Sequence, residues 1–237
     1  MIRKAVTQYL DHDPEVKWRG DDVTRLENLS DIVFALAFGM IVSASSAPQT
    51  LEGLNEFLIG APPVILAFII MTQFWNQHFI YFRRYALADK RIFFLNSLLL
   101  LSILFIAYPL RFILESLYAY GLGAAFGNLD RMEALGIKSF RDAAQITGYF
   151  AIGFGFVQAL FSMMVAHAYR ARDALKLSAL EVALTKKEIW QARSEIGIAA
   201  VAAVVALATP IGPFSGFLLL LALPLELVTT RMAKRGL

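Results

Sequence analysis

The chain has 237 residues, of which 58% are hydrophobic and only 17% are charged. This composition, with a mean hydropathy of +0.59, excludes an ordinary water-soluble domain and favours a membrane protein. The net charge of +3 comes from basic residues beside the apolar runs, without an aromatic-interleaved basic patch, so no nucleic acid is expected as a partner.

The apolar residues gather in blocks long enough to cross about 30 Å of hydrocarbon as helices. Bounded by charged residues, proline and glycine, they predict six spans, at residues 30–47, 57–82, 92–110, 145–167, 195–211 and 213–230. Between the last two, Pro210 and Pro213 stand beside Gly212, which favours a tight reversal over a kinked single helix. The predicted fold is all-α and polytopic, with one six-helix transmembrane domain over residues 30–230.

The distribution of lysine and arginine predicts which side of the membrane each connection faces. With the N-terminus inside, 18 of the 22 basic residues lie on the cytoplasmic side and four on the outer side, as the positive-inside rule favours. Residues 1–29, the linker 171–193 and the tail 231–237 are then cytoplasmic. Residues 111–142 form an external loop, for which a partly helical structure and a position on the membrane surface both stay open. The linker is predicted to be a helical extension of the fourth span. We therefore expect a multi-pass protein of the cell membrane with both termini cytoplasmic.

The first span is predicted to have two faces. At 100° per residue, one narrow stripe contains Ile32, Leu36, Met40, Ser43 and Ala47. The opposite side carries Asp31, Phe34, Phe38 and Ile41. Spacing alone favours ordinary helix packing over pore lining for the stripe. For Asp31, spacing alone supports two roles equally, a structural hydrogen-bond hub and a proton or ion site.

Polar side chains of the second and third spans are expected near Asp31. Trp75 and His78 lie three residues apart late in the second span, and Asn96 lies early in the third. Because the second span leaves the membrane where the first one enters, all four residues are predicted to lie at one depth. Three helices would then bring polar groups together near the cytoplasmic side.

The motifs of enzymes and of metal or cofactor sites are missing from the sequence. It contains no cysteine, no pairing of histidines and carboxylates at metal-ligand spacing, no GxxxxGK[ST] phosphate loop and no G-x-S-x-G turn. We therefore expect no enzymatic activity, no bound metal and no cofactor.

A short motif at the start of the first span resembles a family signature. The R-x-x-x-L-S-D sequence formed by Arg25, Leu29, Ser30 and Asp31 is similar to the R-x-x-x-F-S-D signature of bacterial relatives of the endosomal/lysosomal potassium channel, Transmembrane protein 175. Further residues stand at the family's usual places, namely Trp75, His78, Leu95, Asn96 and Pro109. The six-span layout agrees over nearly the whole chain, whereas the specific motifs lie within about the first 110 residues.

The resemblance implies a potassium-type monovalent cation channel that lacks a P-loop filter and in which the first helices surround the pore. By position, Leu36 would form the main hydrophobic constriction, Met40 the next layer and Ser43 the outermost. Gly39 stands near this filter, where the family often has a threonine implicated in potassium preference, and Ser43 replaces a usual leucine. Passage of K⁺ or other monovalent cations is therefore implied more directly than a preference for K⁺. A structural polar network would comprise Arg25, Ser30, Asp31, Trp75, His78 and Asn96.

The number of repeats bears on assembly. Nothing after residue 118 resembles the region around Ser30 and Asp31, so the chain holds one six-span unit. Animal members of the family carry two such repeats and pair, so the resemblance implies a homotetramer around the first helix in the lipid bilayer. Two alternatives stay open: a proton- or cation-coupled secondary transporter, kept by Asp31 and Glu226, and a membrane assembly subunit without its own flux.

Overall fold

The computed structural model describes residues 11, 13, 15–20, 22–43, 48–126 and 133–219, and every regular element in these ranges is helical. The long helices are α2 (Arg25–Ser43), α4 (Ala61–Tyr85), α5 (Lys90–Phe126), α7 (Phe140–Arg170) and α8 (Ala179–Ala208). The short ones are α3 (Leu51–Ile59), the 3₁₀ helix η1 (Gly212–Ser215) and α9 (Gly216–Leu219). The prediction of an all-α fold is confirmed.

The helices α2, α5, α7 and α8 are each long and apolar enough to cross a membrane, and α3 with α4 meets the same criterion as a bent pair. The first five predicted spans therefore each correspond to a helix or to this pair. The sixth predicted span, 213–230, falls mostly outside the described residues, as do Glu226 and the tail 231–237.

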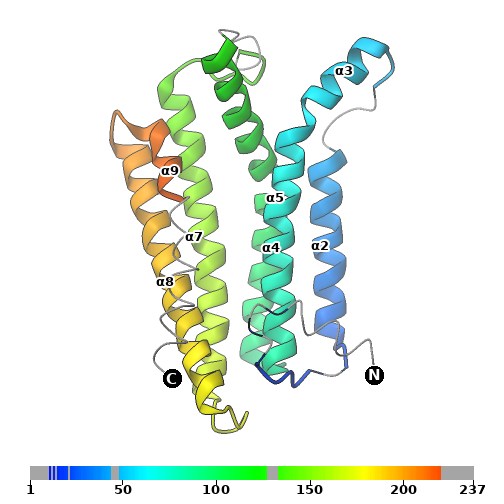
Figure 1. Ribbon diagram of the computed structural model, residues 1–237, viewed down its shortest axis with the longest axis vertical. Helices are drawn as coiled ribbons and strands as arrows, with labels where there is room; N and C mark the ends of the chain where they lie inside the picture. Colours follow the sequence, from blue (N-terminus) through cyan, green and yellow to red (C-terminus); the bar gives the residue numbers. More distant parts are fainter. Residues whose placement is uncertain are drawn as a thin grey trace.

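The long helices run side by side along the longest axis of the molecule (Figure 1). Helix α2 packs against α4 and α5, α5 packs against α7, and α7 pairs most extensively with α8. We call the base the end at which α2, α5 and α8 begin and α4 and α7 end, and the opposite end the top. The buried core lies mainly between α2, α4, α5 and α7, where Phe34, Met71, Leu99 and Phe161 are almost fully enclosed.

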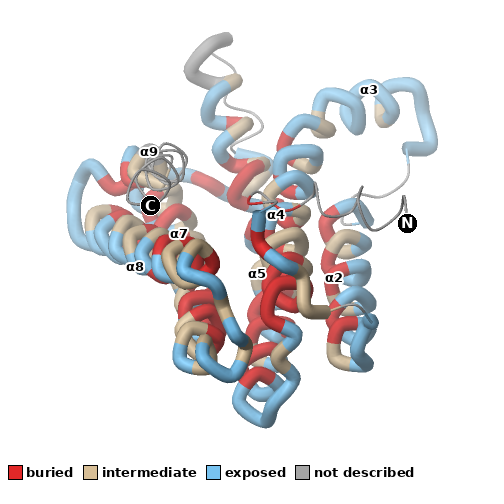
Figure 2. The backbone as a smooth tube through the Cα atoms, turned by 60° about the horizontal axis from the view of Figure 1, so that its bottom comes forward, coloured by how far each residue is buried: buried red, intermediate tan, exposed pale blue. Residues whose placement is uncertain are grey.

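The second predicted span is broken at Gly60. Helices α3 and α4 meet there at an angle of 45°. Pro62 and Pro63 follow Gly60 in the first turn of α4, where a missing N–H is tolerated, but neither proline can donate to the carbonyls of α3. The helix expected to begin at residue 57 therefore begins at Ala61, and the preceding helix α3 is exposed along nearly all its length (Figure 2).

The third span is longer than predicted. Helix α5 continues through Pro109 to Phe126, so its expected end at residue 110 is wrong and the first half of the loop 111–142 is helical. Proline is tolerated inside membrane helices when neighbouring groups satisfy the freed backbone. The upper part of α5 leans away from its lower part in Figure 1, as expected for a proline bend.

The linker 171–193 is not an extension of the fourth helix, because α7 ends at Arg170 and a new helix, α8, begins at Ala179. Ser178 and Glu181 form a capping box at this start, each side chain accepting a hydrogen bond from the other residue's backbone N–H. The second half of the linker is therefore the first part of α8, in one continuous helix with the fifth predicted span.

The predicted reversal after the fifth span is confirmed. Helix α8 ends at Ala208, and η1 and α9 then pack back against α7 and α8. Glycine is required at position 212, because a Cβ there would overlap the carbonyl oxygen of Ala206. The reversal thus brings the chain into close contact with the last turn of α8.

Candidate functional site

Helix α2 has one buried face. Phe34, Ala37 and Ile41 are each at most 1% exposed and pack into the core. These residues recur at intervals of three and four, as one side of a helix requires. The side predicted to face the rest of the subunit does so at Phe34 and Ile41, and Phe38 is partly buried. Asp31, predicted on the same side, is exposed.

The other face of α2 is exposed in the part of the chain that the structure describes. Leu36 is 55% exposed, and Gly39 and Ser43 are exposed as well. Met40 lies at the edge of this face, partly buried against the core. The Ser43 hydroxyl donates a 2.7 Å hydrogen bond to the Gly39 carbonyl oxygen, so these two polar groups satisfy each other along the helix. The predicted constriction residues therefore line an open, largely apolar surface.

A hydrogen-bonded chain connects three helices behind α2. Asn96 of α5 donates from Nδ2 to the Ser30 hydroxyl at 3.0 Å, and Ser30 donates to the Leu26 carbonyl at 2.8 Å. The Asn96 Oδ1 atom then faces His78 of α4, whose Nε2 lies 2.8 Å away. Because that oxygen can only accept, His78 Nε2 carries the proton. Ser30, His78 and Asn96 are each at most 2% exposed.

Asp31 and Trp75 form a second link between α2 and α4. The Trp75 indole Nε1 donates to Asp31 Oδ1 at 3.0 Å, on the exposed side of the pair of helices. Arg25 lies exposed in the first turn of α2 and, among the described residues, forms no hydrogen bond or ion pair with this group. The predicted network is therefore two separate hydrogen-bonded groups, with Arg25 apart from both.

Replacing Asn96 with leucine should destabilise the protein more than replacing Asp31 with asparagine. The leucine would leave the buried His78 N–H without an acceptor, at about 1–3 kcal/mol. Ser30 would lose the hydrogen bond that it accepts but would still donate to the Leu26 carbonyl. Asparagine at position 31 keeps an oxygen that can accept from Trp75. Thermal unfolding followed by size-exclusion chromatography in detergent measures the difference, and equal midpoints for the two variants would contradict the assignment.

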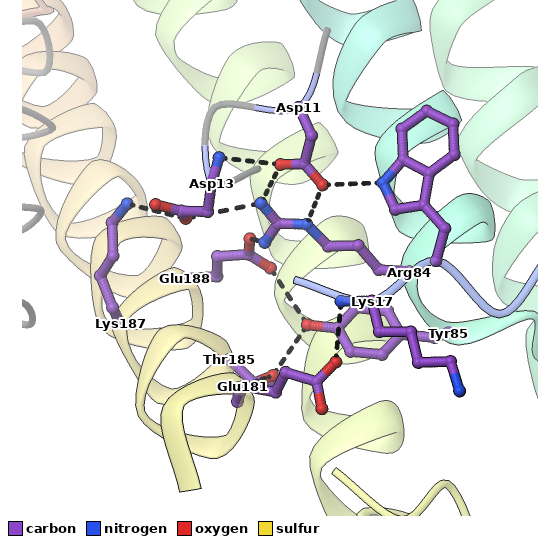
Figure 3. Close-up of polar contacts among 10 residues, drawn as sticks. Asp11, Asp13, Lys17, Arg84, Tyr85, Glu181, Thr185, Lys187 and Glu188 are labelled. Carbon is purple, nitrogen blue, oxygen red and sulfur yellow. Dashed lines mark hydrogen bonds and ion pairs between the residues drawn. The ribbon is translucent and has the colours of Figure 1, made fainter. Parts of the chain in front are cut away.

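A cluster of charges that the sequence did not reveal lies buried at the base (Figure 3). Arg84, in the last turn of α4, is 1% exposed, and its Nε donates to Asp11 Oδ2 at 2.8 Å. The same guanidinium also pairs with Asp11 Oδ1, with Glu188 of α8 and, at 3.4 Å, with Asp13. Lys187 of α8 lies 3.7 Å from Asp13. Arg84 thus joins the N-terminal segment to both α4 and α8, and Lys187 adds a second charge contact between the segment and α8.

A second set of contacts fixes the same segment just before α2. Arg19 forms an ion pair with Glu181 at 2.8 Å, and its backbone N–H donates to the Arg83 carbonyl at 2.8 Å. Gly20 follows so closely over the end of α4 that a Cβ would lie 2.7 Å from the Phe82 carbonyl oxygen. The base therefore sets the position from which α2 enters the bundle.

The top of α2 is held by Arg111 of α5. Its Nη1 donates to the carbonyl oxygens of Ile41 at 2.7 Å and Val42 at 3.4 Å, and its Nε donates to Glu115 at 2.7 Å. The last carbonyls of a helix lack partners within it, and a cation there also complements the helix dipole. Both ends of α2 are thus anchored by arginines whose roles the sequence did not show.

Three comparisons relate the chain to known sequences. The model of the family described as "Endosomal/lysosomal potassium channel TMEM175" matches residues 25–107, from the start of α2 into α5. A potassium channel of Marivirga tractuosa is 29% identical over 243 positions, covering 99% of this chain and 97% of its own length. A potassium channel of Chamaesiphon minutus is 32% identical over 101 positions, covering 39% of this chain and 50% of its own.

Two solved structures are also similar. One is the crystal structure of a threonine-to-alanine variant of the potassium channel MtTMEM175 in complex with a nanobody fusion protein, with a TM-score of 0.79 and 30% identity. The match covers 94% of this chain and 98% of that one. The other is the crystal structure of a lysosomal potassium-selective channel TMEM175 homolog from Chamaesiphon minutus, with a TM-score of 0.56 and 25% identity. That match covers 86% of this chain and 96% of the other.

Proposed function

This chain is a bacterial member of the TMEM175 family, and from that premise we propose that it is a potassium-type monovalent cation channel whose pore is lined by α2. The observation that carries the proposal is the face of α2 with Leu36, Gly39 and Ser43, which is exposed although Phe34, Ala37 and Ile41 of the same helix are packed into the core. Copies of the same helix around an axis would cover this face. The similar proteins that cover most of this chain are named potassium channels.

The spacing of the exposed residues suits a pore. Leu36, Met40 and Ser43 would form successive rings separated by about 6 Å and about 4.5 Å of helix rise. A narrow apolar ring blocks ions by dewetting and conducts when it widens, so a P-loop filter is not needed for gating. Leu36 would form the tightest ring, because methionine is flexible and Ser43 is small.

The polar contacts of α2 support this orientation of the helix. The Ser30–Asn96–His78 chain and the Asp31–Trp75 link hold its lower half against α4 and α5, and Arg111 holds its last turn. Because these contacts lie away from Leu36, they fix the rotation of the helix without occupying the proposed pore. Their role is structural support of the pore wall.

The proposed assembly is a homotetramer with α2 at the axis. One six-span unit encloses no pore by itself. The resemblance implies that animal members have two six-span repeats in each of two paired chains, so four copies of this chain would supply the same number of units. The base carries most of the basic residues and would face the cytoplasm, with both termini there, in the cell membrane.

A buried acidic residue supports the alternative function, a coupled transporter. Glu195 of α8 is buried, where it accepts hydrogen bonds from Gln158 of α7 and from Gln191. A carboxylate inside a membrane bundle is a common feature of proton and ion pathways. The channel proposal is favoured because Glu195 lies between α7 and α8, away from the open face of α2.

Purified protein in liposomes should carry K⁺, Na⁺ and Cs⁺ down their gradients without saturation, and its native mass in detergent should be that of four chains. Flux of each cation is measured separately, with protein-free liposomes as the control. Cation movement that requires a counter-ion would favour the transporter. A tetramer that carries no cations would favour the assembly subunit. A monomer or dimer as the only species would exclude a pore around α2.

A further inference from the structure

The outer face of α8 carries a stripe that changes from charged to apolar along the helix. Exposed positions recur every three or four residues, at Lys186, Trp190, Arg193, Gly197, Val201 and Val204. Trp190 is 68% exposed, although indole side chains usually find cover in a folded protein. We call Lys186, Trp190, Arg193 and Gly197 the α8 surface. It lies where the polar part of the helix gives way to the apolar part.

Contacts on the inner side of α8 give the depth of this surface. The Tyr85 hydroxyl lies 2.9 Å from the Thr185 hydroxyl, and Arg84 pairs with Glu188, so residues 185–188 stand level with the last turn of α4. Trp190 therefore lies within about one helical turn of the end of a membrane helix. Tryptophan is enriched at that depth, where its ring meets the lipid headgroups.

The cations of the α8 surface are available to a ligand. Lys187 points inward to Asp13, whereas the Lys186 Nζ lies 5.6 Å from the centre of the Tyr169 ring. Among the described residues, neither Lys186 nor Arg193 has a carboxylate partner. Two uncompensated positive charges thus flank one exposed indole.

We propose that the α8 surface binds the headgroup phosphate of an anionic phospholipid in the cytoplasmic leaflet; this rests on the orientation given under the proposed function. Helical side chains lean toward the helix N-terminus, so Arg193 leans toward the base and its charge meets the phosphate near Trp190. Gly197 has no atom within 4 Å of the place of a Cβ, which leaves room for the upper part of an acyl chain. A net negative lipid is favoured over a zwitterionic one because both cations lack a counter-charge.

Quenching of tryptophan fluorescence by brominated lipid tests the proposal. Full-length protein is reconstituted in mixtures of phosphatidylglycerol and phosphatidylcholine in which one or the other carries bromine near the top of its acyl chains. The Trp190 signal is the difference between the wild type and Trp190→Phe, since Trp18 and Trp75 are present in both. We expect brominated phosphatidylglycerol to quench that signal more strongly. In Lys186→Gln/Arg193→Gln the preference should fall about fivefold for each cation removed.

Lys90→Gln/Arg91→Gln is the matched control, because it removes two exposed cations at the same end of the bundle. This control should keep the preference for phosphatidylglycerol. An equal loss of the preference in the control would show that general surface charge causes it, and would overturn the proposal. Equal quenching by both lipids in the wild type would also overturn it. So would absence of quenching by either lipid, which would show that protein covers the face. The quenching measurement does not depend on ion flux. If the protein carried no cations but still preferred phosphatidylglycerol, the proposed channel function would be contradicted and the proposed lipid site would stand.

Discussion

Replacing Leu36 with serine should raise the leak of cations through the assembled protein and weaken discrimination among them. The side chain is 55% exposed on the open face of α2, so the change removes no packing inside the subunit. A polar ring holds water more readily than an apolar one, and a barrier lowered by about 1.4 kcal/mol raises flux about tenfold. The measurement is liposome or single-channel flux, normalised to the amount of tetramer.

Two further substitutions on α2 make this result specific to a pore. Ser43→Leu should reduce conductance, because it adds an apolar ring. Val42→Ser should leave flux unchanged, since Val42 is similarly exposed but lies about 120° around the helix from Leu36. If the stripe served packing instead, both Leu36→Ser and Ser43→Leu would lower flux by damaging assembly. Loss of flux in Leu36→Ser with an intact tetramer would overturn the constriction.

The two faces of α2 could be predicted from the sequence because they depend only on the geometry of one helix. Periodicity places Phe34 and Ile41 opposite Leu36, and these residues are buried and exposed accordingly. The approach of Trp75 and Asn96 to the start of α2 could also be predicted, because consecutive antiparallel spans share a depth. The predicted faces of α2 and the shared depth of neighbouring spans therefore agreed with the structure. The predicted ends of single helices did not, since the second span is broken at Gly60, α5 continues past residue 110 and a new helix begins at Ala179.

The anchors of α2 could not be predicted, because they depend on contacts between distant segments. Arg84 lies 73 residues from Asp11, and Arg111 lies 70 residues from Ile41. Both arginines stand beside predicted spans, where the positive-inside rule or an external loop already accounted for them. No periodicity relates a charge at a helix end to its partner. The length of α5 was missed for another reason, since Pro109 suggested a helix end that the membrane fold does not require.

Arg84→Met should reduce the yield of folded protein more than any other single change at the base. It removes the guanidinium that Asp11, Asp13 and Glu188 share, whereas Lys187 lies 3.7 Å from Asp13 alone of the three in the described contacts. Removing one partner of a buried ion pair costs about 3–5 kcal/mol, a large part of the about 5–15 kcal/mol by which proteins are stable. We expect a fall of about 10 °C in the unfolding midpoint. Arg91→Met, at an exposed position, is the control.

Removal of the opposing charges should rescue the variant. Adding Asp11→Asn and Glu188→Gln to Arg84→Met leaves polar groups of the same shape but two fewer negative charges, so much of the lost midpoint should return. Arg84→Lys should fall between the wild type and methionine, because an ammonium cannot reproduce the forked contacts of a guanidinium. If the triple variant were no more stable than Arg84→Met, the loss would arise from packing of the arginine stem and not from its charge.

Acid should narrow the difference between the wild type and Arg84→Met. Burial by itself raises the pKa of Asp11, but the hydrogen bond and charge of Arg84, together with hydrogen bonds from the Asp13 N–H and the Trp18 indole, hold that pKa below the ordinary value of 3.8. The stability that Asp11 contributes is therefore fully present above pH 3.8 and is lost as the pH falls through its lowered folded-state pKa. Arg84→Met lacks the part of this contribution that comes from Arg84 at every pH, and protonation relieves the repulsion among its carboxylates. Unfolding midpoints of both proteins, measured from neutral pH down to this range, should converge, and a constant gap would show that Arg84 does not act through the charge of Asp11.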